Sequence, residues 1–316
     1  MLNPWASADH RCNDRNAREG DSREALGIAY HAASLSSGTA MDTSIVFVGG
    51  GNMATSLISG LRQADCPGER ITVVEPDKAK GEQLAAKYGV HVVTAATADV
   101  LDAEVVVLAV KPQMLRDVCQ GLAKPMGNNR PLVISIAAGV PIAGLREWLG
   151  ADHAYVRSMP NTPSLIGAGA TGLYADERVT AGQRELAETI LATAGIVAWV
   201  DDEKQLDAVT ATSGSGPAYF FAFMEAMQAG AQELGLDEST ARELVLHTAL
   251  GAARMAIESG DDPTTLREKV TSPGGTTAAA LDEFSQGELG ALVERAMRSA
   301  AGRADSLARE LLDKST

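Results

Sequence analysis

The feature that most constrains the fold is a short apolar run that leads directly into a glycine-rich turn and then into a helix. Ile45–Val48 is continuously apolar, Gly49-Gly50-Gly51-Asn52-Met53-Ala54 follows it, and Leu57, Ile58 and Leu61 recur at helical spacing. In this G-x-G-x-x-A pattern the glycines permit a tight turn and the close approach of a pyrophosphate, which lies on the N–H groups at the helix start. The segment predicts a dinucleotide site formed by Gly49, Gly50, Gly51, Asn52 and Met53.

The chain from Ile45 to about Val200 alternates between strand and helix patterns. Near-continuous Val and Ile runs indicate strands that are buried on both faces, hence a parallel sheet with helices on either side. We expect strands at Ile45–Val48, Ile71–Val74, Val105–Val110, Leu132–Ile136, Tyr155–Met159 and Ile196–Val200, with a weaker one near Val92 and Val93. Residues 41–203 are therefore predicted to form an α/β domain with a Rossmann-type doubly wound parallel sheet.

The strand signal disappears after Asp201-Asp202-Glu203, and residues 204–316 are predicted to be all-helical. Asp237 can cap a helix that carries Leu244 and Val245, and Ser285 with Glu288 can form a capping box for the last helix.

One of these helices, Pro217–Met224, is apolar on nearly every side and holds three of the five phenylalanines. A helix that is apolar all round must be covered all round, and roughly 110 residues of helix would struggle to do so alone. We infer that a second subunit helps to cover it. The alternative is the buried central helix of a self-sufficient bundle.

Composition limits the partners and the compartment. Lys and Arg total 27 against 41 Asp and Glu, a net charge of −14, which argues against nucleic acid or an anionic membrane as a partner. No apolar run approaches the roughly 20 residues that span a bilayer. The three cysteines, Cys12, Cys66 and Cys119, have no C-x-x-C spacing, and the five histidines have no metal-ligand spacing. We expect a cytoplasmic protein without a metal site.

Residues 1–40 mix Arg, Asp, Asn and Ser with little apolar periodicity, so we expect a disordered N-terminal extension. The stretch lacks the apolar region of a secretory signal, and its acidic residues argue against a transit peptide. The alternative is that translation begins at Met41.

A second cluster of small and hydroxylated residues lies far along the chain, at Val270-Thr271-Ser272-Pro273-Gly274-Gly275-Thr276-Thr277-Ala278. Glycine lets backbone N–H groups approach an anion without a Cβ in the way, and the hydroxyls add donors. Such a turn can hold a carboxylate. The alternative is an ordinary helix start that is capped by a Ser or Thr.

Three further segments follow predicted strands at the edge where ligands of open α/β sheets bind: Ala109–Gln113, Ser135–Val140 and Arg157–Pro163. Taken singly, each has an ordinary explanation, because a lysine at a strand end is usually solvated and a run of small residues usually serves packing.

Taken together, six motifs resemble the pyrroline-5-carboxylate reductase family in order and spacing, from Ile45 to about Leu312. They are Gly49–Met53, Ala109–Pro112, Ser135–Gly139, Met159–Pro163, Ser213–Tyr219 and Ser272–Thr277. The resemblance implies reduction of 1-pyrroline-5-carboxylate to L-proline by NADPH or NADH. It also implies a homodimer, or a ring of dimers, in which the substrate site forms where the helical dimerisation domain of one subunit meets the cofactor domain of its partner.

The resemblance also implies roles for single residues. Thr277 would be the catalytic residue, hydrogen-bonding the substrate nitrogen and passing on a proton. The substrate carboxylate would be held by Ser272 and the amides of Gly274, Gly275 and Thr276. The adenosine side of the cofactor would contact Ala109, Val110, Lys111 and Pro112, and the nicotinamide would contact Ile136, Ala137 and Ala138.

Two positions depart from the family pattern. Glu75, at the end of the second strand, favours the 2′-hydroxyl of NADH and repels the 2′-phosphate of NADPH, where relatives often have a neutral residue. Alternatively, Glu75 points into solvent and Lys78 offsets its charge. Ala96 stands where many relatives have an Asn that contacts the ribose. We expect the chain to use both cofactors.

Two other functions remain open at this point. A β-hydroxyacid dehydrogenase or imine reductase shares the glycine fingerprint and the helical tail, and would use a lysine or acid such as Lys269. A nucleotide-sensing protein would bind NADPH without oxidising it.

Overall fold

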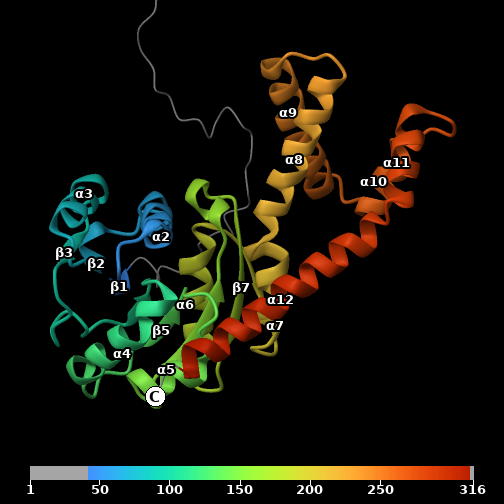
Figure 1. The fold of residues 1–316 in the computed structure, drawn as a ribbon. Helices are drawn as coiled ribbons and strands as arrows, with labels where there is room; N and C mark the ends of the chain where they lie inside the picture. Colours follow the sequence, from blue (N-terminus) through green and yellow to red (C-terminus); the bar gives the residue numbers. More distant parts are fainter. Residues whose placement is uncertain (1–41, 314–316) are drawn as a thin grey trace, which may run out of the picture. The chain divides into compact units, whose positions relative to one another are not determined.

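The computed structural model describes residues 42–313. The extension predicted for residues 1–40 lies outside this range. Within it, the chain forms a sheet flanked by helices, and then a series of helices without further strands (Figure 1).

Within residues 42–313, eight strands form one sheet in the order β3-β2-β1-β4-β5-β6-β7-β8. The strands are β1 Ile45–Val48, β2 Ile71–Val74, β3 His91–Val93, β4 Val105–Leu108, β5 Leu132–Ser135, β6 Ala154–Met159, β7 Gly169–Ala175 and β8 Gly195–Trp199. Neighbours are parallel except for β6 and β7, which are antiparallel. The carboxyl ends of strands β1 to β6 therefore lie at one edge of the sheet, which is the edge where ligands of open α/β sheets bind.

The sequence did not predict β7, and the prediction of an all-parallel sheet is corrected by this strand. Its sequence, Gly-Ala-Thr-Gly-Leu-Tyr-Ala, carries almost none of the β-branched residues that mark strands. Three other strands end earlier than expected: β4 at Leu108, β5 at Ser135 and β8 at Trp199. The residues beyond them, Ala109, Ile136 and Val200, each donate one amide hydrogen bond to the neighbouring strand and then leave the sheet.

Helices cover both faces of the sheet, as a doubly wound fold requires. One buried cluster joins the sheet to α2 (Asn52–Gln63), α3 (Lys78–Tyr88) and α6 (Ala181–Ala192). A second cluster joins the other face to α4 (Pro112–Met126) and α5 (Ile142–Leu149). The predicted Rossmann-type class is confirmed.

The remaining elements are helical, as predicted. They are α7 Gln205–Val209, the π-helical turn η4 Thr210–Gly214, α8 Gly216–Glu233, α9 Glu238–Glu258, α10 Pro263–Lys269, α11 Thr276–Gln286 and α12 Leu289–Asp313. None of the helices between residues 42 and 313 combines the length and the apolar character needed to cross a membrane.

Of two predicted helix caps, the structure confirms one and contradicts the other. The Asp237 side chain accepts a hydrogen bond from the Thr240 amide and caps α9, as predicted. The capping box expected from Ser285 and Glu288 is wrong. Ser285 lies inside α11, and its carbonyl accepts the Glu288 amide at 3.0 Å to close a turn in which Glu288 adopts a φ of +52°. Backbone groups thus make the hydrogen bonds of the turn between α11 and α12, so no side-chain capping box forms.

The end of α12 returns to the sheet region. Leu311 and Leu312 pack against the cluster beneath α4 and α5, and a Cβ added to Gly144 would lie 2.8 Å from Leu312. In Figure 1, α10 and α11 lie at the opposite end of α12.

Candidate active site

The glycine loop between β1 and α2 is held tightly on one side and open on the other. Gly49 has a φ of +100°, and a Cβ there would lie 2.9 Å from the Ala109 carbonyl oxygen. A Cβ on Gly50 would lie 2.6 Å from Leu84. At Gly51, by contrast, the nearest atom is the Ala109 oxygen at 3.9 Å. The loop is thus pressed against the ends of β4 and α3 while its Gly51 side leaves room for a ligand.

The start of α2 has the features of a phosphate site. Gly51 is its N-cap, makes no side-chain capping bond, and is followed by no acidic residue in the first turn. The first N–H groups of such a helix lack intrahelical acceptors, and the helix dipole favours an anion there. Gly51, Asn52 and Met53 therefore fit a pyrophosphate, and the fit rests on the open amides and on the space that a Cβ at Gly51 would fill.

Glu75 follows β2 and folds back beneath the glycine loop. Its Oε2 accepts a hydrogen bond from the Gly50 amide at 3.1 Å and lies 2.7 Å from Lys80 Nζ, and its Oε1 accepts from the Asp77 amide at 3.1 Å. Burial alone would raise the pKa of the Glu75 carboxyl, but Lys80 and the two amides outweigh it and hold this pKa below its ordinary value. Glu75 is therefore a fixed anion of the cofactor edge.

The alternative that Glu75 points into solvent beside Lys78 is wrong. The Glu75 side chain is 9% exposed, and Lys78 reaches Glu82 instead. Ala96, the other departure, packs against the cluster beneath α4 and α5.

The loop after β4 leads into α4. Lys111 is the N-cap of α4 without a side-chain capping bond, and Pro112 occupies its first turn, where a missing N–H costs nothing. Lys111 is exposed. Ala109 to Pro112 thus lie beside the glycine loop, which Ala109 contacts directly.

The loop after β5 contacts helix α12, near the C-terminal end of the described residues. Ile136 and Ala137 are buried and Ala138 is exposed. Gly139 has a φ of +76°, and a Cβ there would lie 3.8 Å from Leu307 of α12. Helix α12 therefore packs directly on the predicted nicotinamide loop.

Two charged residues to which the sequence analysis gave no role hold the same loop. Glu203 Oε1 accepts the Ile142 amide at 2.8 Å, at the start of α5, and pairs with the buried Arg157 of β6 at 3.1 Å. A third missed residue is Asn161, whose side chain donates to the Ser213 carbonyl at 3.0 Å and accepts from the Ala170 amide at 2.9 Å. Asn161 lies in a motif quoted above, whereas nothing local marks Glu203.

The turn before α11 leads into a helix start, but not into the Ser- or Thr-capped start offered as the alternative. Gly275 donates to the Ser272 carbonyl at 3.0 Å and Gly274 has a φ of +69°, the geometry of a type II turn with Pro273 in its second position. Helix α11 begins at Thr276, so a helix start is present, but its cap is Gly275 and no side chain caps it. The amides of Thr276 and Thr277 are thereby left open to an anion, whereas the Gly275 amide is used by the turn itself.

Thr277 lies in the first turn of α11 and is half-buried. Within residues 42–313 its hydroxyl makes no hydrogen bond to the chain. Lys269, the lysine nearest to the turn, is held by Asp261 with 2.6 Å between Nζ and Oδ2.

A single chain does not bring the two predicted halves of the site together. The C-terminal end of α12 lies on the nicotinamide loop, while α11 and its turn precede the other end of this helix (Figure 1). The 25 residues of α12 extend roughly 37 Å at 1.5 Å per residue. The turn of one chain therefore stands remote from the nicotinamide loop of the same chain.

The helical segment exposes a broad apolar surface. Phe220, Phe221 and Phe223 of α8 are 69%, 61% and 45% exposed. An apolar hollow of about 380 Å³ lies beside them and is also lined by Asn161 and Pro217. Exposed aromatic side chains in this number mark an interface with another protein chain. The buried-bundle alternative for α8 is wrong.

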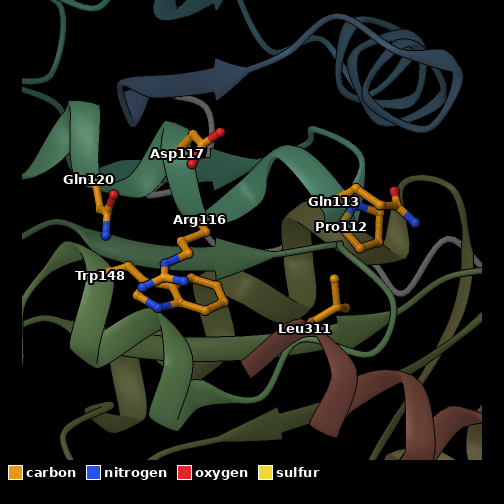
Figure 2. Close-up of a pocket in the computed structure, with 7 residues that line it drawn as sticks. All are labelled: Pro112, Gln113, Arg116, Asp117, Gln120, Trp148 and Leu311. Carbon is orange, nitrogen blue, oxygen red and sulfur yellow. The ribbon is translucent and has the colours of Figure 1, made fainter. Parts of the chain in front are cut away.

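Another hollow, of about 260 Å³, lies between α4, α5 and the end of α12 (Figure 2). The Arg116 guanidinium lies over the Trp148 ring, 5.9 Å from its centroid, and Leu311 lines another side of the hollow. Of the predicted cofactor residues, it includes Pro112.

No three His, Cys, Asp or Glu side chains between residues 42 and 313 gather in a way that could hold a metal ion. Cys66 and Cys119 are buried free thiols.

Two family models match the chain. Residues 203–307 match pyrroline-5-carboxylate reductase dimerisation, and residues 44–139 match NADP oxidoreductase coenzyme F420-dependent. The helical segment is thus a dimerisation domain, and the glycine loop lies in an NADP oxidoreductase domain.

Similar proteins agree with both matches. The chain is 49% identical over 267 residues to a pyrroline-5-carboxylate reductase of Pseudomonas aeruginosa, covering 84% of this chain and 97% of that protein. A solved pyrroline-5-carboxylate reductase from Coxiella burnetii is 44% identical, with a TM-score of 0.81 over 84% of this chain and 98% of that chain. The Plasmodium falciparum enzyme, solved with NADP bound, is 26% identical with a TM-score of 0.74 over 85% and 99%. On this identity, across nearly the whole length of its relatives, the chain is an oxidoreductase that belongs to the pyrroline-5-carboxylate reductase family.

Proposed function

We propose that the chain reduces the C=N bond of 1-pyrroline-5-carboxylate to give L-proline, with NADPH or NADH as the reductant. The observation that carries the proposal is the presence of two uncapped helix starts, at α2 and α11, each preceded by glycines. One suits the pyrophosphate of a dinucleotide and the other suits the carboxylate of an amino-acid-like ring.

The residues at the carboxyl edge of the sheet would hold the cofactor. Gly49 to Met53 would hold its pyrophosphate, Glu75 and Ala109 to Pro112 its adenosine side, and Ile136 to Ala138 its nicotinamide. The small side chains of this last loop let a flat ring lie against the backbone. When bound, the reduced dinucleotide supplies the hydride for the imine carbon.

The substrate is held by the turn before α11. Ser272 and the amides of Gly274 and Thr276 hold its carboxylate, and the Thr277 hydroxyl hydrogen-bonds its ring nitrogen. The Gly275 amide, which the resemblance also implied, is used by the turn itself. A protonated cyclic imine accepts a hydride readily, so the protein needs chiefly to position the carbon and keep the nitrogen hydrogen-bonded. A threonine hydroxyl is a weak acid, so Thr277 positions the ring and relays a proton that water supplies.

The complete site requires two chains. The turn and the nicotinamide loop of one chain are separated by α12, and the exposed phenylalanines of α8 supply the surface on which a second copy packs. The Ser272–Thr277 turn of one subunit therefore completes the cofactor domain of its partner, in a dimer or a ring of dimers. The domain boundary near residue 203 separates these two parts, and the proposed location is the cytoplasm.

A spectrophotometric assay tests the proposal. Purified protein with NADPH or NADH should show a loss of absorbance of the reduced cofactor only when pyrroline-5-carboxylate is added, with proline as the product. Nucleotide binding without oxidation would reject the enzyme in favour of a sensor. Oxidation with a β-ketoacid or an unrelated imine, but not with pyrroline-5-carboxylate, would indicate a different reductase.

A further inference from the structure

An ion pair between Glu75 and Lys80 lies directly behind the glycine loop. Lys80 Nζ is 2.7 Å from Glu75 Oε2, and the side chains are 43% and 9% exposed, respectively. The carboxylate thus belongs to the interior and the ammonium reaches the surface. Glu75 directly follows β2, at the place where a dinucleotide of this fold presents the ribose of its adenosine half, and Lys80 lies in the first turn of α3.

The two partners differ in how firmly they are fixed. The amides of Gly50 and Asp77 hold one Glu75 oxygen each, and both belong to the backbone. A carboxylate offers about four acceptor positions, so these two amides and Lys80 leave room for one more donor. Lys80 is a flexible side chain that can change its acceptor without disturbing the backbone.

The neighbouring charges do not compete for this position. The Asp77 side chain accepts the Lys80 amide and caps α3. Lys78, two residues before Lys80, is 86% exposed and lies 4.0 Å from Glu82. The local charge that a 2′ substituent meets is therefore that of the Glu75–Lys80 pair.

We propose that Glu75 and Lys80 together read the 2′ substituent of the adenosine ribose. Glu75 accepts a hydrogen bond from the 2′-hydroxyl of NADH, and Lys80 exchanges Glu75 for the 2′-phosphate of NADPH. A phosphate carries more charge than a carboxylate and attracts the ammonium more strongly, while the two amides continue to hold Glu75. The remaining repulsion between Glu75 and the phosphate keeps the preference small, which accounts for use of both cofactors. The inference rests on the proposed function only in taking a nicotinamide dinucleotide as the ligand.

Binding titrations with NAD⁺ and NADP⁺, at fixed ionic strength and without pyrroline-5-carboxylate, test the pair. Lys80→Met should raise the Kd for NADP⁺ about tenfold or more and change that for NAD⁺ less than about threefold, because a hydrogen bond to a charged group is lost for one ligand only. Lys78→Met is the matched control and should leave both Kd values unchanged. Glu75→Gln should lower the Kd for NADP⁺ and raise that for NAD⁺. An equal effect of Lys80→Met on both ligands would overturn the proposal.

A double variant separates direct contact from simple neutralisation of Glu75. If Lys80 binds the phosphate, Lys80→Met still weakens NADP⁺ binding in the Glu75→Gln protein. If Lys80 only offsets the Glu75 charge, the second substitution has no effect there, and the proposed exchange is refuted. Reduction of pyrroline-5-carboxylate is measured separately. A protein with this binding pattern but no reductase activity would refute the proposed function alone, and an active protein without the pattern would refute the pair alone.

Discussion

Gly51 is a position at which ligand binding and folding can be separated. Its φ of −65° and ψ of 178° suit any residue, and a Cβ there meets only the Ala109 oxygen at 3.9 Å. We expect Gly51→Val to leave the thermal unfolding temperature nearly unchanged while weakening dinucleotide binding by at least about tenfold, because the side chain fills the space above the open amides. Calorimetric titration and thermal unfolding measure the two effects. If the variant folds and its nucleotide affinity is unchanged, the loop does not bind the pyrophosphate.

Thr277 is the residue on which the proposed proton relay depends. We expect Thr277→Ala to lower kcat by at least roughly tenfold, because positioned proton transfer contributes at least that much, while Thr277→Ser restores most of it. Steady-state kinetics with pyrroline-5-carboxylate measure both. An unchanged kcat in Thr277→Ala, with activity lost in Lys269→Ala, would instead support a lysine-dependent reductase.

For single residues, the sequence predicts a role where the contacts that define this role are made with residues nearby in the sequence. The glycines of the β1–α2 loop were predictable because their neighbours in sequence make the turn and the helix start. The Ser272–Thr277 turn was recognisable from its composition for the same reason. Glu203 was not, because it bonds Ile142, 61 positions earlier, and no local pattern encodes that distance. Lys80 was missed although it is close to Glu75 in sequence. Which of the two nearby lysines pairs with Glu75 depends on the direction of the Glu75 side chain, which turns toward the glycine loop and meets Lys80 and not Lys78.

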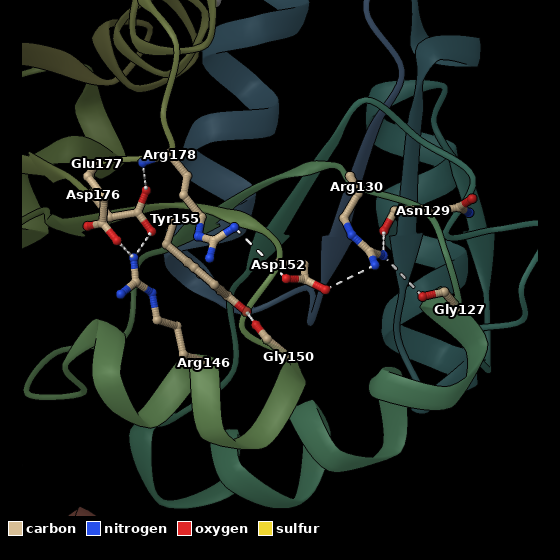
Figure 3. A network of polar contacts seen from close by, with 10 residues as sticks. All are labelled: Gly127, Asn129, Arg130, Arg146, Gly150, Asp152, Tyr155, Asp176, Glu177 and Arg178. Atoms are coloured by element: carbon tan, nitrogen blue, oxygen red, sulfur yellow. Dashed lines mark hydrogen bonds and ion pairs between the residues drawn. The ribbon is translucent and has the colours of Figure 1, made fainter.

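Among the elements, the β7 end and α5 are joined by charges away from the cofactor edge (Figure 3). Arg146 of α5 lies 2.9 Å from Asp176, whose side chain is 2% exposed, and 2.5 Å from Glu177, which is 70% exposed. Asp176 also accepts the Arg178 amide at 3.0 Å. Close by, the Tyr155 hydroxyl donates to the Gly150 carbonyl at 2.6 Å, which ties β6 to the end of α5.

We expect Asp176→Asn to lower the free energy of unfolding by about 1–3 kcal/mol, because the buried carboxylate is removed and its charge-assisted hydrogen bond from Arg146 is lost. The matched change Glu177→Gln should leave the free energy of unfolding nearly unchanged, since exposed ion pairs contribute little. Urea unfolding at neutral pH gives both values. Equal effects of the two changes would show that burial of Asp176 does not determine its contribution.

Elements were predictable where hydrophobic periodicity was strong. The runs Ile45–Val48 and Val105–Leu108 are buried at every position, and the sequence pattern marked both. β7 was not predicted because glycine and alanine have little preference for strands. Its place in the sheet is determined by pairing with β6 and β8. The box of Ser285 and Glu288 failed because a backbone-closed turn replaced it.

For the whole molecule, the central expectation is that two chains share each site. Thr277→Ala and Gly51→Val chains, assayed alone at a limiting nucleotide concentration, should each have about a tenth of the wild-type activity or less. When they are mixed under conditions that exchange subunits, half of the dimers are mixed and each mixed dimer has one intact site, so activity should return to about a quarter of the wild-type value. If no activity returns although mixed dimers form, each site lies within one chain.

The assembly was predictable in outline from sequence, since an all-apolar helix needs more cover than its neighbours provide. The structure adds which side chains require that cover, among them Phe220 and Phe221. The distance between the two halves of the site could not be predicted, because it depends on the straight course of α12 and on its contact with Gly139.

In the proposed dimer, helix α12 sets the distance between the nicotinamide loop of its own subunit and the Ser272–Thr277 turn that reaches the other subunit. Its last turns are anchored at Gly139 and Gly144, so any added residue in its middle would displace the preceding turn by about 1.5 Å and rotate it by about 100°. The length of α12 is therefore expected to matter for activity, and insertions along this helix should be tolerated less well than insertions in loops outside the proposed site.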